Sequence, residues 1–217
     1  MRSKYFLQTI VSTMYDEIAT TESGRVATTV RQKSIAIEER KNQSGAIGTA
    51  TKVFCTSFDS RIGRIYVAST ENGVCKISVP KETHKDFFQW LHGHFDADSV
   101  VHNRSRNKDI IDQLNRYFNG KLVRFTCPVD PVGTPFQVRV WKELIKISYG
   151  TTVSYKQLAK RVAAPQAFQA VGRANAANPL PIIIPCHRVL GQDGALVGYS
   201  CGVKTKEFLR KAWGPDR

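Results

Sequence analysis

The chain has 217 residues, 41% of them hydrophobic, which is enough for a sizeable core in one or two domains. No apolar run approaches the roughly 18 residues of a membrane span, and acidic residues interrupt any N-terminal targeting peptide, so we expect an intracellular protein without membrane contact. A formal net charge of +14 favours a polyanionic partner over a merely solubilising basic surface. Five cysteines without a C-x-x-C pair argue against a disulfide framework.

Residues 1–50 carry no recognisable chemistry and are expected to form an extension. Strand patterns follow over 53–58, 64–69 and 74–79, with Asn72-Gly73 as a hairpin turn, so we expect an antiparallel meander. Helical periodicity then predicts helices over 82–95 and 108–118, and 121–129 is interpreted as a further strand. The domain boundary is expected between about 120 and 133.

Histidines gather in this first half of the chain, at His84, His92, His94 and His102. No cysteine with the spacing of a metal ligand accompanies them, so we predict no metal site.

The second half begins with Thr134-Pro135, an N-cap followed by proline, which predicts a helix over 135–147. Ser154 and Gln157 form a capping box at the start of a helix ending at Val162, and a turn at 163–165 leads to a helix over 166–177. This helix-turn-helix has an outward face suited to a sugar-phosphate backbone. Such pairs are also plain packing units, and the pattern alone does not decide between the two.

The stretch Pro181-Ile-Ile-Ile-Pro-Cys-His-Arg-Val-Leu190 fixes a cysteine between prolines and basic residues. Cys186 is either inert packing or a nucleophile. Burial alone would raise the pKa of its thiol, whereas the neighbouring His187 and Arg188 favour the thiolate.

Six stretches in this order resemble the methylated-DNA–protein-cysteine methyltransferases, or O6-alkylguanine-DNA alkyltransferases. They are Thr134-Pro-Phe-Gln-Val-Arg-Val-Trp141, Gly150-Thr-Thr-Val-Ser-Tyr-Lys-Gln-Leu-Ala159, Ala170-Val-Gly172, Ala177-Asn-Pro179, Ile184-Pro-Cys-His-Arg-Val189 and Gly198-Tyr199 with Gly202-Val203. The resemblance implies an α/β protein with a small N-terminal ribonuclease-H-like α/β domain (51–130). A C-terminal mainly helical, winged-helix-like domain with the helix-turn-helix (131–217) would follow it.

By this resemblance, Cys186 would take the alkyl group from guanine O6 in a single stoichiometric event, with the base flipped out of the duplex. His187 would be the base through a water, because adjacent side chains on extended backbone point apart. Tyr155 would donate to the guanine ring, and Asn178 would be a hinge. Further expected roles are pocket lining (Pro181, Val189, Tyr199, Ser200), DNA contact (Gln166, Gln169, Ala170, Arg173, Ala174) and structural support (Arg188).

The chain departs from the family pattern at several positions. Gln169 stands where the family usually has an arginine that fills the vacated base stack, although Arg173 lies one turn on. Trp213 stands where a glutamate orients the histidine. The positions of the zinc ligands that some relatives carry include Thr51, Thr70 and Cys75, so no zinc is expected. The resemblance also implies no cofactor, because the alkylated base supplies the electrophile.

The expected partner is double-stranded DNA containing O6-alkylguanine, bound by a monomer in the nucleus of a eukaryote or the cytoplasm of a prokaryote. The first alternative is a protein of the same fold that binds alkylated DNA with weak or no transfer. A remote alternative is a Cys-His hydrolase, disfavoured because such enzymes bring cysteine and histidine together from distant parts of the sequence.

Overall fold

The structure is a computed structural model that describes residues 51–191, 194–195 and 203–211. The expectations for residues 1–50 and for Tyr199, Ser200 and Trp213 lie outside this part. Within it, no helix is long and apolar enough to cross a membrane.

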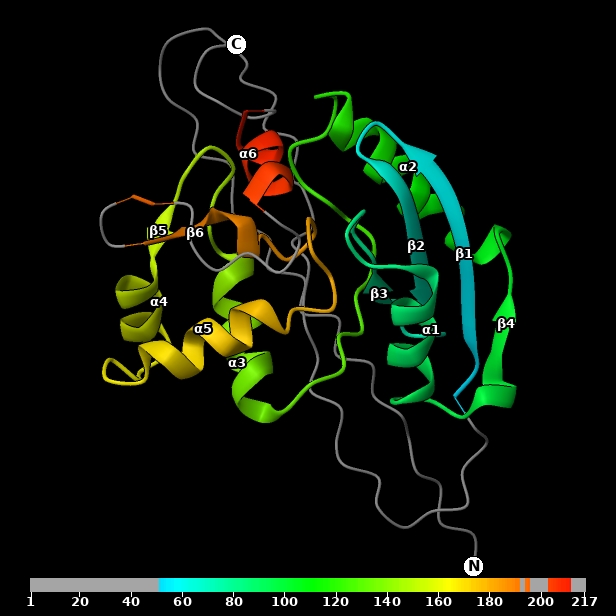
Figure 1. Cartoon of the computed structure of the whole chain (residues 1–217), viewed down its shortest axis with the longest axis horizontal. Helices are drawn as coiled ribbons and strands as arrows, with labels where there is room; N and C mark the ends of the chain where they lie inside the picture. Colours follow the sequence, from blue (N-terminus) through cyan, green and yellow to red (C-terminus); the bar gives the residue numbers. More distant parts are fainter. Residues whose placement is uncertain (1–50, 192–193, 196–202, 212–217) are drawn as a thin grey trace, which may run out of the picture. The chain divides into compact units, whose positions relative to one another are not determined.

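The N-terminal half is built on a four-stranded mixed sheet (Figure 1). Its strands are β1 (Val53–Ser60), β2 (Gly63–Ser69), β3 (Val74–Ile77) and β4 (Val100–His102), in the order β3-β2-β1-β4. The predicted antiparallel meander β1-β2-β3 is confirmed. Strand β4 pairs parallel to β1 and was not predicted, because three residues are too few to show an alternating pattern.

The hairpin between β2 and β3 depends on Gly73. Its φ is +150°, and a Cβ there would lie 2.6 Å from the Pro128 carbonyl group. Only glycine accommodates both the backbone conformation and the close approach of the other chain segment.

Helices cover both faces of this sheet. On one face Phe87 and Leu91 of α1 (His84–His92) pack against Val53, Cys55 and Ala68. On the other, α2 (Lys108–Phe118) contributes Ile110, Ile111 and Leu114 to the main core. Short 3-10 turns η1 (Ala97–Ser99) and η2 (Ser105–Asn107) flank β4. The predicted helix over 82–95 is therefore shorter at both ends, since Thr83 caps it and Gly93 ends it.

The strand predicted over 121–129 is wrong. This segment is irregular and makes only an isolated bridge between Val129 and Val74. Its alternating pattern is real, because Phe125, Cys127 and Val129 are buried, but Pro128 has no N–H to donate to a ladder. The Thr126 N–H donates instead to the Gln113 side chain, at 2.8 Å.

The C-terminal half is mainly helical. Its elements are α3 (Pro135–Ile145), β5 (Val153–Ser154), α4 (Tyr155–Arg161), α5 (Phe168–Ala176), η3 (Cys186–Arg188), β6 (Val189–Leu190) and α6 (Val203–Lys211). Both predicted capping boxes are present, at Thr134 with Gln137 and at Ser154 with Gln157. Helices α4 and α5 form the predicted helix-turn-helix, although α5 begins two residues later than expected.

Two features hold the helix-turn-helix in place. The Trp141 indole of α3 is buried and donates to the Ala174 carbonyl of α5, at 2.8 Å. Strand β5 pairs parallel with β6, joining Val153 to Val189 and Ser154 to Leu190. This two-residue ladder was not predicted, yet it places the start of α4 beside the end of the cysteine segment.

Candidate active site

Cys186 opens a tight turn at the end of an apolar run. Its N–H donates to the Ile184 carbonyl at 2.7 Å, and the Val189 N–H that closes the turn donates back to the Cys186 carbonyl. The residue is 1% exposed. Cys186 and His187 thus lie in a 3-10 turn rather than on extended backbone, so the reason given above for their side chains pointing apart is wrong.

Asn178 fastens this segment to the end of α5. Its side-chain Nδ2 donates to the Ile184 carbonyl and its Oδ1 accepts from the Leu180 N–H, both at 2.9 Å. The asparagine is buried, so both hydrogen bonds are shielded from water. The residue expected to act as a hinge therefore ties together the two ends of the turn that precedes the cysteine.

Tyr155 lies close enough to Cys186 for the two to interact electrostatically. Burial raises the pKa of the Tyr155 hydroxyl, negative charge on Cys186 raises it further, and a hydrogen bond from Asn175 lowers it. That bond joins Asn175 Nδ2 to Tyr155 Oη at 3.4 Å. The structure thus brings together two residues that are 31 positions apart in the chain. The raised pKa keeps the Tyr155 hydroxyl protonated and able to donate.

His187 is fully buried, and its pKa is well below the ordinary 6.5, first because burial disfavours the imidazolium. The positive charges of Arg188 and Lys206 lower it further. The imidazole is therefore neutral near pH 7, the form that can accept a proton.

This buried neutral imidazole makes stability depend on pH. The unfolded chain binds a proton at this residue below about pH 6.5, and the folded chain binds it only at lower pH, so we expect the unfolding free energy to fall as the pH drops below about 6.5. The slope contributed is up to about 1.4 kcal/mol per pH unit. Urea unfolding across this range measures it. A His187→Gln variant should lose the part of the pH slope that His187 contributes, whereas a variant at exposed His92, His92→Gln, should keep it. Equal slopes for wild type and His187→Gln would contradict the assignment.

Arg188 is buried and reaches away from the turn. Its Nη1 donates to the Ile147 carbonyl at 2.6 Å, and its guanidinium lies 5.6 Å from the centre of the Tyr149 ring. Burial raises the pKa of Tyr117 to about 12, a rise that the nearby Arg188 limits. These contacts connect the cysteine turn to α2 and to the end of α3, as expected of a structural residue.

The outward face of α5 differs in part from the expected DNA-contacting set. Gln166, Gln169 and Arg173 are exposed and Ala170 is half-buried. Ala174 is 2% exposed beneath α3, so its assignment to DNA contact is wrong. Sequence reasoning missed Phe168, which is 52% exposed at the start of α5, because an aromatic residue is ordinarily expected to be buried and no local pattern indicated otherwise.

The expected pocket residues are only partly within the described chain. Pro181 and Val189 are both buried, and the Val189 carbonyl accepts from Lys206 Nζ at 2.7 Å. Lys206 is itself fully buried and was not singled out in the sequence. The burial of Lys206 could have been expected from its spacing of three residues from apolar Leu209, because residues three apart share a helix face.

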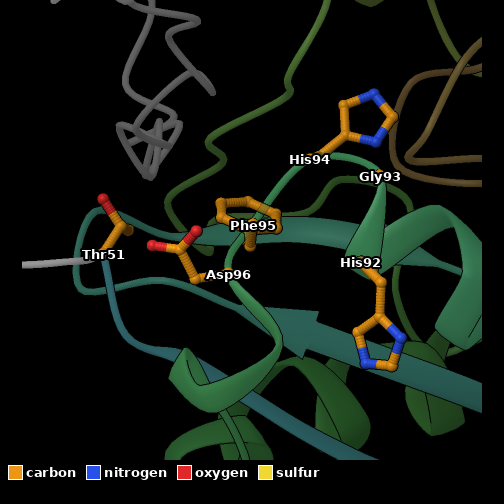
Figure 2. A pocket seen from close by; sticks show the side chains of 6 residues that line it. All are labelled: Thr51, His92, Gly93, His94, Phe95 and Asp96. Atoms are coloured by element: carbon orange, nitrogen blue, oxygen red, sulfur yellow. The ribbon is translucent and has the colours of Figure 1, made fainter.

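A separate hollow is lined by Thr51, His92, Gly93, His94, Phe95 and Asp96 (Figure 2). The rings of His92 and His94 extend to opposite sides of the chain, and His94 stacks on Trp90 with 4.1 Å between ring centres. Among residues 51–191, 194–195 and 203–211, no group of three or more His, Cys, Asp and Glu side chains could hold a metal ion.

Comparisons with known proteins agree with this architecture. Residues 53–131 match the family described as 6-O-methylguanine DNA methyltransferase, ribonuclease-like domain, and residues 135–212 match its DNA binding domain. A methylated-DNA–protein-cysteine methyltransferase of Methanosarcina barkeri is 42% identical over 153 residues, which is 70% of this chain and 92% of that protein. The inducible protein of the same name from Bacillus subtilis is 37% identical over 66% of this chain and 80% of its own.

Solved structures show the same likeness. The O6-methylguanine methyltransferase of Mycobacterium tuberculosis has a TM-score of 0.65 and 36% identity, covering 76% of this chain and 96% of its own. The structure of the Mycobacterium tuberculosis protein in complex with DNA has a TM-score of 0.63 and 35% identity, and it covers 75% of this chain and 96% of its own. The predicted α/β fold class, with a ribonuclease-like first part and a helical second part, is confirmed. The chain belongs to the 6-O-methylguanine DNA methyltransferase family.

Proposed function

We propose that this protein repairs DNA by moving an alkyl group from O6 of guanine to Sγ of Cys186. The observation that carries the proposal is the placement of Cys186 in a fixed turn next to His187 and near Tyr155, in a chain that matches methylated-DNA–protein-cysteine methyltransferases over both halves. The enzyme class is a single-turnover S-methyltransferase, because a thioether on cysteine is not readily hydrolysed.

In the reaction, His187 takes the thiol proton through a water, and the thiolate attacks the alkyl carbon. A carbon–sulfur bond forms as the carbon–O6 bond breaks, and the bonding electron pair goes to guanine. Tyr155, held protonated by burial, donates to the ring as negative charge develops there. The proton removed from sulfur balances the one that guanine regains, so the alkylated base is the electrophile and no cofactor takes part.

The proposed partner is double-stranded DNA containing O6-alkylguanine. Gln169 and Arg173 are exposed on α5, and Gln166 is exposed just before it, so all three are available to the DNA backbone. Ala170 is slim enough to allow close approach. Because Cys186 is 1% exposed, the base must leave the stack to reach it. Pro181, Val189, Tyr199 and Ser200 are proposed to surround the flipped base.

We further propose that the division at about residue 130 separates the two domains, and that the protein acts as a monomer within the nucleus or the prokaryotic cytoplasm. In the described part of the chain, Cys55, Cys75, Cys127 and Cys186 are buried free thiols, which supports a reducing compartment.

The experiment is an incubation with duplex DNA that carries a labelled methyl group on guanine O6. We expect the label to move to protein and to plateau at one methyl per chain even with excess DNA. Tight binding to methylated duplex without transfer would instead support the alkylated-DNA-binding alternative, which Gln169 motivates because it lacks the guanidinium of the usual arginine.

A further inference from the structure

Phe168 is an exposed aromatic residue on a helix whose other exposed side chains are small or polar. It is the first residue of α5 and is 52% exposed. The other exposed residues of α5, which the structure describes from end to end, are Gln169, Arg173 and Ala176, and none of these has a ring. Leaving a phenylalanine in water forgoes the hydrophobic gain of burying it, so the folded protein gains little from this ring.

Phe168 shares one face of α5 with two residues that lie against Tyr155. Positions three, four and seven apart fall on the same face of a helix, so Phe168, Gly172 and Asn175 form a row. A Cβ at Gly172 would lie 3.9 Å from Cε1 of Tyr155, and Asn175 Nδ2 donates to Tyr155 Oη at 3.4 Å. The row therefore faces Tyr155, and Phe168 lies at its outer end, about 6 Å along the helix axis from Gly172.

A ring at this place suits the demand that a flipped base makes on the duplex. A gap in the stack is costly because the bases beside it lose their contacts, and apolar side chains such as phenylalanine fill gaps of this kind in proteins that bind the minor groove. An aromatic ring stacks on any base, since every base has a π-face. Stacking by Phe168 would therefore serve a lesion in any sequence context.

We propose that Phe168 inserts its ring into the base stack at the place that the alkylated guanine vacates, and so keeps that guanine in the site beside Tyr155. The partner of the ring is the pair of bases that flank the lesion in duplex DNA. A guanine that reaches Cys186 passes Tyr155, so the duplex that it leaves lies outside the row, where Phe168 faces solvent. This inference rests on the proposed function, because it requires a base that leaves the duplex.

The first test compares transfer from two substrates, duplex DNA bearing O6-methylguanine and the free base O6-methylguanine, which needs no flipping. At saturating duplex, Phe168→Ala should transfer methyl about tenfold more slowly than wild type, because one stacking contact is lost. Its rate with the free base should be unchanged. Phe168→Tyr keeps the ring and should match wild type with both substrates.

Phe208 provides the matched control. It is a second exposed phenylalanine in the C-terminal half, 36% exposed on α6 rather than on α5. Phe208→Ala removes the same group from the surface and should leave both rates unchanged.

The second test detects stacking directly and needs no transfer. An indole that stacks on bases loses fluorescence, so Phe168→Trp emission should fall when duplex bearing O6-methylguanine is added. Cys186→Ala in the same chain keeps the base alkylated, and the Cys186→Ala protein with Phe168 intact supplies the background emission. Phe208→Trp in that background should show no fall.

Three results would overturn the role of Phe168. They are equal duplex rates for Phe168→Ala and Phe208→Ala, an equal slowing of Phe168→Ala with duplex and with free base, and Phe168→Trp emission that bound duplex leaves unchanged. Weaker binding of duplex by Phe168→Ala with a wild-type rate at saturation would also overturn it, because the ring would then be an ordinary contact. A wild-type protein that transfers methyl from neither substrate would refute the proposed function, and Phe168→Trp emission would still decide whether the ring stacks.

Discussion

Replacing Cys186 with alanine is expected to abolish alkyl transfer completely while leaving DNA affinity within about twofold of wild type. The thiolate is the group that forms the new bond, and no other residue near it can substitute for sulfur. The exposed residues proposed to contact DNA are Gln169 and Arg173 on α5 and Gln166 just before it. They keep their positions, because alanine fits the space of a small buried thiol. Labelled methyl transfer and a fluorescence binding titration measure the two effects.

Cys127 provides the matched control. It is 3% exposed, and burial raises the pKa of its thiol to about 12, with Asp109 adding to the rise, so it stays protonated and unreactive. Cys127→Ala should transfer methyl at the wild-type rate in the folded protein. Residual transfer by Cys186→Ala, or loss of DNA binding together with transfer, would count against the assignment.

Replacing Asn178 with alanine is expected to cost about 2–4 kcal/mol of stability and to slow transfer, because two buried hydrogen bonds are lost at once. The Ile184 carbonyl and the Leu180 N–H would remain buried without this side chain, and the segment leading to Cys186 would lose its attachment to α5. Urea unfolding gives the stability change, and single-turnover kinetics on the folded fraction gives the rate.

Asn119 is a suitable comparison for that variant, since its side chain also bonds to a backbone carbonyl, Asn115, but is exposed. Asn119→Ala should cost less than about 1 kcal/mol. If Asn178→Ala were no more destabilising than Asn119→Ala, the hinge would not fasten the cysteine segment as described.

Much of the fold could be predicted because local signals agree with the tertiary structure. Thr134 with Gln137 and Ser154 with Gln157 marked helix starts correctly, since a capping box satisfies backbone donors within one turn. The strand predicted over 121–129 failed because alternating burial does not require a ladder, and Pro128 prevents one.

The site residues were predictable only where they belong to the motifs that carry the family resemblance. Cys186, Tyr155 and Asn178 follow from the resemblance, and the structure brings them near one another. Ala174 was assigned to DNA contact but is buried. Helical periodicity shows which residues share a face, but it does not show which neighbouring helix covers that face. Lys206 escaped notice because a lysine in a basic helix is ordinarily exposed, and its burial arises from packing between segments distant in the chain.

The central claim is that one particular sulfur receives the alkyl group. Mass measurement of the tryptic peptide containing Cys186, after incubation with duplex DNA bearing O6-methylguanine, tests it most directly. The account predicts a Cys186 peptide heavier by one methyl group in every molecule, with the Cys127 and Cys201 peptides unchanged. An unmodified Cys186 peptide from folded protein that has bound the methylated duplex would contradict it.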